Sequence, residues 1–367
     1  MKLSLDGATY SQALDAVRGA AGGAGPTIRT VLIEAEADGR VHFTATDTLL
    51  QSTWSVDAQV DEAGRISADL EDISPVAKHL PKGTDVGIDV QGGFATVTAG
   101  RSQFRFGTLD PETFPAWDAQ IGASEPVAVT SDAIYRMFGG VMHAVAGDDG
   151  MDALRGVLLT NHGGATPLRA VATDGHRFAC CEVPDLELEL PADGIILPAR
   201  AAREALRLTK GVGMIGLAAD ARVVQMDGGP EILLSKLIDA KYPDYRRLLE
   251  QGYEHHIEVD RKMLIEALAR VGAILTRQPI LKLIVDANGF HLRADRDQTT
   301  AVESVELARP DGFAPVELGL NARYLGDALK SMVSPIVRLH YSAPSAPVRL
   351  AGAADPGLTQ IMMPARV

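Results

Sequence analysis

The chain has few of the residues that covalent frameworks and membrane spans require. Its 367 residues include only two cysteines, and these are the neighbours Cys180 and Cys181. Adjacent cysteines exclude a disulfide framework, and their spacing suits neither a zinc site nor thioredoxin-type chemistry. No apolar run approaches the roughly 20 residues that a membrane helix needs, and the start MKLSLDGATY is not typical of a signal peptide. We therefore expect a soluble protein of a reducing compartment.

Positive charge is also scarce. The chain has 35 Lys and Arg against 48 Asp and Glu, a formal net charge of −13. This total argues against nucleic acid, because proteins that bind DNA tightly carry basic surfaces. The distribution weakens the argument, since segment 199–209 (ARAAREALRLT) is strongly basic while the alternating, strand-like segments are acidic. Basic side chains on selected helices and acidic side chains elsewhere produce an asymmetric electrostatic field around the molecule.

Catalytic and metal-binding motifs are missing as well. There is no GxSxG nucleophile elbow, and the pair His255-His256 has no third ligand at metal spacing. Asp148-Asp149-Gly150 lacks the closing Glu of a calcium loop. Asp174 and His176 could belong to a catalytic arrangement, but no nucleophile accompanies them. We expect no active site, no metal and no cofactor, and a structural histidine in a turn.

What the chain does contain is a long internal repeat. A length of 367 residues with 46% hydrophobic residues suits two or three globular domains. Asp47, Asp174 and Asp295 each close a similar alternating run, at intervals of about 120 to 127 residues, a period too long for a solenoid and suited to a domain. The sequence therefore predicts three domains, with boundaries at 1–122, 123–251 and 252–367.

Each repeat contains the same succession of helical and alternating patterns. Apolar and small residues at helical spacing predict a first helix in each repeat at 10–21, 132–146 and 261–275, and a second helix at 70–80, 199–209 and 322–332. Alternating runs predict strands at 31–35, 41–46, 86–89, 95–98, 157–160, 168–173, 215–218, 223–226, 281–286, 290–294, 337–341 and 348–350. The predicted plan is β-α-β-β-β-α-β-β-β, used three times.

Three further stretches have unusual chemistry. Segment 168–181 (LRAVATDGHRFACC) alternates into an Asp-Gly turn and out again, which is a strong hairpin signal. Segment 241–247 (KYPDYRR) and the last residues, 361–367 (IMMPARV), each combine apolar side chains with a Pro and an Arg. Methionines suit surfaces that accept varied partners. If the fold brings the three together, they form an apolar groove edged by cations, which would bind a peptide.

These stretches carry a resemblance to a known family. ATDGHRFA, SKLIDAKYPDYRRLL and the terminal MPARV, together with GRSQFRFGTL and NARYLGDAL, closely resemble the bacterial DNA polymerase III beta subunit, the beta sliding clamp, over the whole chain. The resemblance implies an α+β fold of three repeated DNA-clamp domains. Each has two helices and outer antiparallel sheets, and two chains form a ring as a head-to-tail dimer. It implies a non-catalytic subunit of a DNA-directed DNA polymerase, a nucleotidyltransferase holoenzyme.

The implied function is that of a DNA polymerase processivity factor. The family encircles double-stranded DNA without sequence preference and tethers the replicative polymerase alpha subunit, the clamp loader delta subunit, other polymerases and repair proteins through their short linear motifs. The expected location is the cytoplasm, at the nucleoid. Two other classes stay open from the residues alone: a hydrolase that uses Asp174 and His176, and a repeat-built scaffold that does not bind DNA.

The family motifs imply residues for three surfaces. The peptide-binding residues would be Leu154, Thr173, His176, Phe178, Pro243, Arg247, Leu248, Tyr324, Ile361, Met363, Pro364 and Arg366. The DNA-facing residues would be Arg200, Arg203, Arg207, Lys210, Arg270 and Arg277. The dimer interface would pair Arg101, Phe104, Arg105 and Phe106 with Ile274, Leu275 and Glu303.

The chain departs from the family pattern at the implied groove. Ala153 stands where an aromatic residue is common, Ala365 replaces a long side chain, and Phe178 is bulkier than the usual Leu. We expect one part of the groove to have a different shape.

Overall fold

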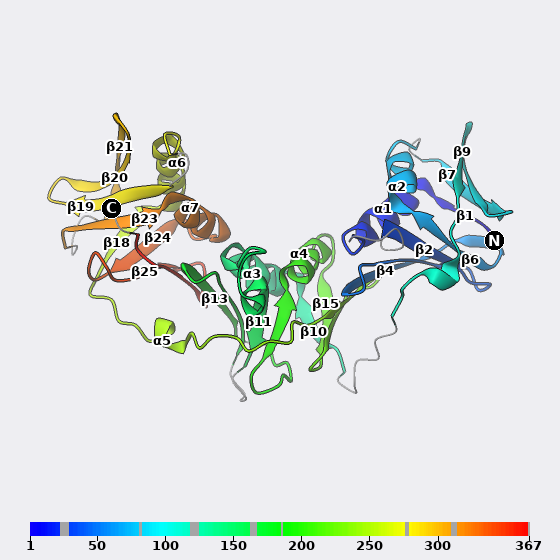
Figure 1. Ribbon diagram of the computed structural model, residues 1–367, viewed down its shortest axis with the longest axis horizontal. Helices are drawn as coiled ribbons and strands as arrows, with labels where there is room; N and C mark the ends of the chain where they lie inside the picture. Colours follow the sequence, from blue (N-terminus) through cyan, green and yellow to red (C-terminus); the bar gives the residue numbers. More distant parts are fainter. Residues whose placement is uncertain are drawn as a thin grey trace. The chain divides into compact units, whose positions relative to one another are not determined.

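The computed structural model describes residues 1–22, 29–80, 83–117, 125–161, 167–184, 186–275, 279–309 and 314–365. The chain forms two compact units (Figure 1). Unit 1 contains Met1–Ser131 and Glu204–Leu237, and unit 2 contains Asp132–Arg203 and Ile238–Val367. The second repeat therefore contributes to both units. Helices α3 (Ser131–Val141) and α4 (Ala199–Leu208) lie where the chain passes between them.

Unit 1 contains two antiparallel sheets, with strand orders β5-β1-β7-β8-β9 and β10-β15-β16-β17-β4-β3-β2-β6. Pairing of β17 with β4 joins strands of the second repeat to the sheet of the first. The strands are β1 (Lys2–Asp6), β2 (Thr30–Ala35), β3 (Arg40–Thr46), β4 (Leu50–Asp57), β5 (Gln59–Glu62), β6 (Gly64–Asp69), β7 (Asp85–Gln91), β8 (Phe94–Ala99), β9 (Ser102–Gly107), β10 (Val127–Thr130), β15 (Met214–Ala219), β16 (Val223–Asp227) and β17 (Glu231–Lys236). A 3-10 turn, η2, follows β9 at Pro111–Thr113.

The helices of unit 1 begin at acidic caps. Asp6 accepts a hydrogen bond from the backbone N of Thr9 (3.0 Å) and starts α1 (Gly7–Arg18), and Asp69 similarly starts α2 (Leu70–Lys78). The apolar faces of both helices are buried among side chains of the sheets in one hydrophobic core. Helices α1 and α2 therefore share one core with strands of both sheets.

Unit 2 contains a nine-stranded sheet, β14-β11-β12-β13-β26-β25-β24-β18-β22, and a four-stranded sheet, β21-β20-β19-β23. Pairing of β13 with β26 joins the second repeat to the third. The strands are β11 (Gly156–Thr160), β12 (Leu168–Thr173), β13 (Arg177–Val183), β14 (Ile195–Pro198), β18 (His255–Asp260), β19 (Ile280–Asp286), β20 (Gly289–Arg296), β21 (Thr299–Val305), β22 (Leu307–Arg309), β23 (Val316–Asn321), β24 (Ile336–Tyr341), β25 (Val348–Gly352) and β26 (Leu358–Met362).

Two long helices of unit 2 also begin at polar side chains that cap them. Asp260 caps α6 (Arg261–Gly272), and Asn321 caps α7 (Ala322–Ser331) by accepting hydrogen bonds from two backbone N–H groups. Helices α6 and α7 pack against each other (Figure 1). Shorter helical segments are η3 (Met142–Ala144), η4 (Asp152–Arg155) and α5 (Arg246–Leu249).

The six predicted helices and twelve predicted strand runs are confirmed, with ends that differ by a few residues. The predicted plan is wrong in the number of strands, because it has only three before each second helix. Among the described residues the structure has five there in the first repeat (β2 to β6), four in the second (β11 to β14) and five in the third (β19 to β23), and the last of each set runs directly into the helix, as the plan predicts. The additional strands β5 and β22 pair with β1 and β18, which are not their neighbours in sequence, so alternation within one segment does not report them.

In the described part of the chain, no helix is long and apolar enough to cross a membrane. Within the same residues, no group of three or more His, Cys, Asp and Glu side chains could hold a metal ion.

Candidate functional site

The hairpin between β12 and β13 is held by its own side chains. Asp174 Oδ1 accepts hydrogen bonds from the backbone N of His176 (2.9 Å) and of Arg177 (3.0 Å). Thr173 Oγ1 accepts one from the N of Gly175 (3.1 Å) and donates to the carbonyl of Arg177 (2.7 Å). Gly175 has φ +88°, a backbone conformation that favours glycine. The sequence TDGHR therefore forms a rigid turn, with the His176 side chain exposed at its tip.

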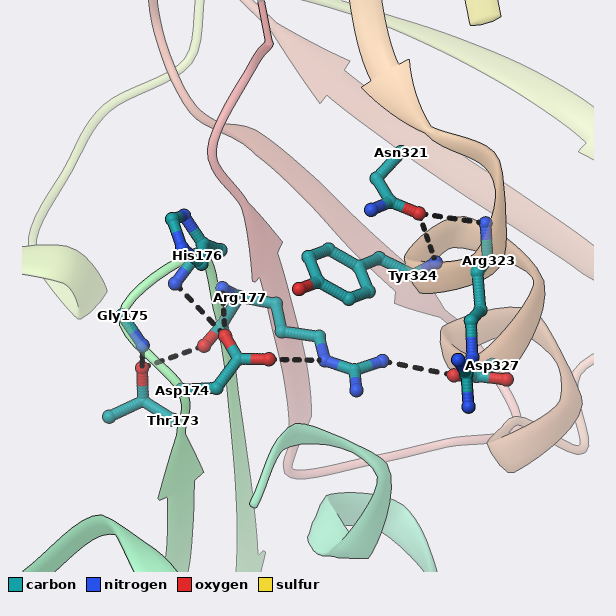
Figure 2. Close-up of polar contacts among 9 residues, drawn as sticks. All are labelled: Thr173, Asp174, Gly175, His176, Arg177, Asn321, Arg323, Tyr324 and Asp327. Carbon is teal, nitrogen blue, oxygen red and sulfur yellow. Dashed lines mark hydrogen bonds and ion pairs between the residues drawn. The ribbon is translucent and has the colours of Figure 1, made fainter. Parts of the chain in front are cut away.

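Arg177 fixes this turn to helix α7 (Figure 2). Its Nε donates to Asp174 Oδ2 (3.0 Å), and its Nη1 donates to Asp327 Oδ2 (3.0 Å). The guanidinium also lies 4.1 Å from the centre of the Tyr324 ring. The side chains of Arg177 and Asp174 are only 13% and 14% exposed, so both charges are largely removed from water and satisfied by each other. A hairpin of the second repeat and a helix of the third are thus joined.

The same contacts exclude the hydrolase interpretation. Both carboxylate oxygens of Asp174 are used, one by backbone N–H groups and one by Arg177, so the carboxylate does not orient the His176 ring. The thiols are poor nucleophiles, because burial raises the pKa of Cys180 to about 12 and of Cys181 to about 11. The contacts of Asp174 therefore serve to hold the turn.

The C-terminal strand lies beside the hairpin. In the register of β13 with β26, Phe178 pairs with Ile361 and Arg177 with Met362. The backbone N of Met363 then donates to the carbonyl of His176 (2.9 Å), and the N of Ala365 donates to Gly319 (2.8 Å). These bonds hold Met363, whose side chain is 47% exposed, next to the turn. Pro364 follows and is half-buried.

Apolar side chains form a cluster on this face of the sheet. Phe178 and Ile361, each 2% exposed, are joined by Tyr245, whose ring centre lies 5.5 Å from that of Phe178. Leu248 packs against the same cluster while remaining half-buried, and Tyr242 donates from its hydroxyl to the carbonyl of Val171 (3.5 Å). Segment 241–249 therefore lies over the strands that carry Phe178 and Ile361.

Cations border the cluster. Asp244 accepts from Arg246 Nε (2.8 Å), and the hydrogen bonds from Arg246 lower the pKa of Asp244 to about 2. Arg247 is exposed, and no described residue forms an ion pair with it. Of the two neighbouring arginines, Arg247 is the one whose charge is left for another molecule.

The structure thus brings most of the predicted peptide-binding residues into unit 2. Thr173, His176, Phe178, Ile361 and Met363 adjoin directly, and Pro243, Arg247 and Leu248 belong to the segment that lies over them. Tyr324 lies beside the hairpin through its contact with Arg177. Leu154 is buried in η4, and its neighbour Ala153 is the residue that joins the cluster. Arg366 lies outside the described residues.

Sequence reasoning did not single out Asp327, which forms the junction with Arg177. Arg177 and Tyr245 belong to the segments 168–181 and 241–247 that the sequence marked as unusual. No sequence pattern, however, indicates that an Asp 150 positions away meets Arg177.

The basic residues predicted to face DNA have different surroundings. Arg203 and Lys210 are exposed, and Arg200 is half-buried with contacts of its own. Arg207 donates to Glu204 (2.7 Å) and to the buried Glu231, which also accepts from Ser52 (2.7 Å). Arg270 pairs with Glu303 (2.8 Å), a residue predicted for the dimer interface. Arg277 lies outside the described residues.

Part of each predicted half of the dimer interface lies at the edge of a sheet. Strand β9 is the edge of its five-stranded sheet, and β21 is the edge of its four-stranded sheet. Arg101 and Arg105 are exposed, whereas Phe104 and Phe106 alternate with them and pack against the core of unit 1. Ile274 and Leu275 follow the end of α6 and are half-buried.

Three repeats that carry an apolar surface bordered by cations are typical of a protein that binds other macromolecules. Comparisons with known proteins agree in detail. Models of the DNA polymerase III beta subunit match this chain in its N-terminal domain (residues 15–118), central domain (128–244) and C-terminal domain (246–366). The chain therefore belongs to the DNA polymerase III beta subunit family, the sliding clamps. It is a non-catalytic processivity factor that tethers the polymerase.

The similarity extends over full lengths. The beta sliding clamp of Caulobacter vibrioides is 31% identical with complete coverage of both chains, and that of Escherichia coli K12 is 28% identical with the same coverage. A solved structure of the Caulobacter crescentus pol III beta subunit matches with a TM-score of 0.88 and 30% identity, covering both chains fully. A sliding clamp from Pseudomonas aeruginosa bound to griselimycin matches with a TM-score of 0.90 and 26% identity, again over both chains. The family binds DNA and partner proteins, the latter through a peptide-binding site.

Proposed function

We propose that two copies of this chain form a head-to-tail ring around double-stranded DNA. The ring receives short linear motifs of the replicative polymerase alpha subunit, the clamp loader delta subunit, other polymerases and repair proteins. It works at the nucleoid in the cytoplasm. The domains are those predicted from the repeat, at 1–122, 123–251 and 252–367.

The observation that carries this proposal is the peptide surface of unit 2. Phe178 and Ile361, each 2% exposed, form a buried apolar floor beneath Leu248, Met363 supplies a flexible exposed wall, and Arg247 supplies a charge that no described residue pairs. Apolar anchors of a motif would pack against Leu248 and Met363 above this floor, and its polar or acidic atoms would meet Arg247. The proposed set of peptide-binding residues also includes His176, Thr173, Tyr324, Pro243, Pro364, Leu154 and Arg366.

Two unpaired strand edges support the dimer. An exposed edge presents unpaired N–H and C=O groups that a second chain can satisfy. In a head-to-tail ring, β9 of one copy pairs with β21 of the next, so each interface uses two different strand edges. Two such interfaces close the two copies into a ring. Arg101 and Arg105 would lie at this contact with Phe104 and Phe106, opposite Ile274, Leu275 and Glu303.

For the DNA-facing surface we propose Arg200, Arg203 and Lys210 as the leading cations, with Arg277. Arg207 and Arg270 contribute less, because carboxylates already compensate their charges. Few phosphate contacts suit a sliding ring, since each contact adds salt-sensitive affinity that opposes movement.

The dimer is tested by its mass in solution. The chain has a mass of 38.9 kDa, and sedimentation should give twice that value. Ile274→Ala with Leu275→Ala should give folded monomers, because these side chains supply apolar area at the proposed contact. Val333→Ala is a matched control, because Val333 is an exposed apolar residue outside the proposed contact. A wild-type monomer, or a double variant that remains dimeric, would rule out the proposed interface.

A further inference from the structure

A line of side chains continues from the peptide surface across the nine-stranded sheet. Phe178 pairs with Ile361, Ile361 with Arg349, Arg349 with His340, and His340 with His256. Residues that pair directly across neighbouring strands point to the same face, so all five lie on the face that carries the apolar cluster. With strands about 4.8 Å apart, Arg349 is one strand from the apolar floor and His256 is about 14 Å away.

The polar end of this line is cationic and lacks a neutralising acid. Arg349 donates from Nη2 to Thr359 Oγ1 (3.4 Å), and its Nε is buried without a hydrogen-bond partner in the described part of the chain. Among the described residues, no carboxylate forms an ion pair with Arg349. An arginine whose guanidinium is compensated by no anion presents its charge to whatever molecule lies next to it.

The surroundings of His340 show the same excess of positive charge. Burial lowers the pKa of His340 to about 4, and the charges of Arg349, His256 and Arg338 act in the same direction. The ring of Tyr253 lies 6.0 Å from that of His340, and the Tyr253 hydroxyl is buried without a described partner. His340 therefore contributes a neutral imidazole, a hydrogen-bonding group, beside the permanent charge of Arg349.

The acids near this line are already engaged. Glu258, which pairs with Arg338 across β18 and β24, is 6% exposed and accepts from Arg338 Nε (2.7 Å). Glu254 lies 3.9 Å from His255 Nε2, at the other end of β18. Neither is paired with Arg349. The local field at Arg349 is thus positive, although the whole chain carries a net charge of −13.

From this arrangement we infer that Arg349, His340 and Tyr253 form an additional subsite for an acidic residue that flanks the apolar motif of a bound peptide. The inference rests on the proposed peptide surface, because the motif would be anchored at Leu248 and Met363, next to Phe178 and Ile361. An extended peptide advances about 3.3 Å per residue, so an Asp or Glu two to four positions from the anchor reaches Arg349 or His340. Acidic flanks would then distinguish partners that share the same apolar motif.

The test uses the full chain and two labelled peptides with the same apolar motif. One peptide carries Asp and Glu in both flanks, and the other carries Asn and Gln at those positions. Fluorescence anisotropy should show the acidic peptide binding five- to tenfold more tightly, with the difference shrinking as salt rises. Arg349→Gln should remove this difference and leave the neutral peptide unchanged. Arg349→Lys should keep part of it, and Arg296→Gln, an exposed arginine of the other sheet, should keep all of it.

The outcomes separate this inference from the proposed function. Equal affinity of the two peptides for the wild-type chain would overturn the subsite while leaving the peptide surface intact. Equal weakening of both peptides by Arg349→Gln would also overturn it, since that result describes a structural role. Deletion of Met363–Val367 should abolish binding of both peptides, and if it abolishes neither, the proposed function fails instead. A further outcome is that a single-stranded oligonucleotide displaces the bound acidic peptide and leaves the bound neutral peptide in place. That result would overturn the subsite and assign Arg349 to nucleic acid.

Discussion

Two arginines of the same unit show how surroundings decide what a charge does. Arg177 is held between two carboxylates and against an aromatic ring, and its side chain is 13% exposed. Arg349 donates a hydrogen bond to a threonine hydroxyl and forms no ion pair with a carboxylate among the described residues. The charge of Arg177 is compensated inside the fold, where this residue joins a hairpin to helix α7. The charge of Arg349 remains available to a ligand. Whether an arginine is paired with a carboxylate thus distinguishes positioning residues from binding residues.

Substitution of Arg177 tests whether the paired arginine stabilises the fold, which is the largest effect that we expect. Arg177→Ala leaves Asp174 and Asp327 without their cation, and breaking a buried pair from one side typically costs about 3–5 kcal/mol. Because Asp327 is 31% exposed and partly solvated, we expect the lower end, about 3 kcal/mol of the free energy of unfolding. Urea unfolding of the full chain measures it. Arg349→Gln is the matched change and should cost less than about 1 kcal/mol; equal losses for both variants would contradict the comparison.

Removal of the C-terminal residues tests the surface that Arg177 positions. Deleting Met363–Val367 removes the exposed Met363 side chain and two backbone hydrogen bonds, one that Met363 N donates to His176 and one that Ala365 N donates to Gly319. We expect peptide affinity to fall at least 30-fold, about 2 kcal/mol, while the sedimentation mass stays that of the wild type. Met214→Ala, another exposed methionine, should leave peptide affinity unchanged. Unchanged affinity in the truncated chain would remove this segment from the site.

A buried histidine near the junction predicts a dependence of stability on pH. Burial lowers the pKa of His143 to about 4, and the nearby charge of Arg177 adds to this effect. The unfolded chain binds a proton near pH 6.5 and the folded chain does not, so stability present above pH 6.5 is lost as pH falls toward 4. Between pH 7 and pH 5 this loss should be about 2 kcal/mol. His143→Gln should lose correspondingly less stability over this interval, whereas His79→Gln, an exposed histidine, should lose as much as the wild type. Identical losses in all three would show that His143 does not contribute.

The smallest expected effect concerns stability at Arg349 itself. Arg349→Lys keeps the charge and should change the free energy of unfolding by less than about 0.5 kcal/mol, because its hydrogen bond to Thr359 is long at 3.4 Å. Thermal unfolding followed by circular dichroism is sufficient to measure it. A larger loss would mean that the guanidinium is needed by the fold, as that of Arg177 is.

The sequence predicts the helices well because the two signals of a helix, a capping residue and apolar residues at helical spacing, lie within a few residues of each other. Asp260 before α6 and Asn321 before α7 are caps that accept backbone hydrogen bonds, and the apolar residues that follow have helical spacing. The hairpin is likewise local, since Thr173, Asp174 and Gly175 bond within the turn. Local rules suffice for these elements.

Features that depend on distant residues could not be predicted in this way. Strand β22 pairs with the distant strand β18, and Arg177 meets Asp327 only after β13 has paired with β26. The line from Ile361 through Arg349 to His256 depends on the register of three strand pairs. Placement of the peptide-binding residues came from family motifs and not from periodicity.

Retention on DNA of different topology tests the central proposal most directly. Chains loaded onto a nicked circular plasmid and then passed through a sizing column at moderate salt should remain with the DNA, and linearising the plasmid should release them. This is expected because a closed ring is held by enclosure, not by salt-sensitive phosphate contacts. Equal retention on circular and linear DNA, or retention on neither, would contradict the account.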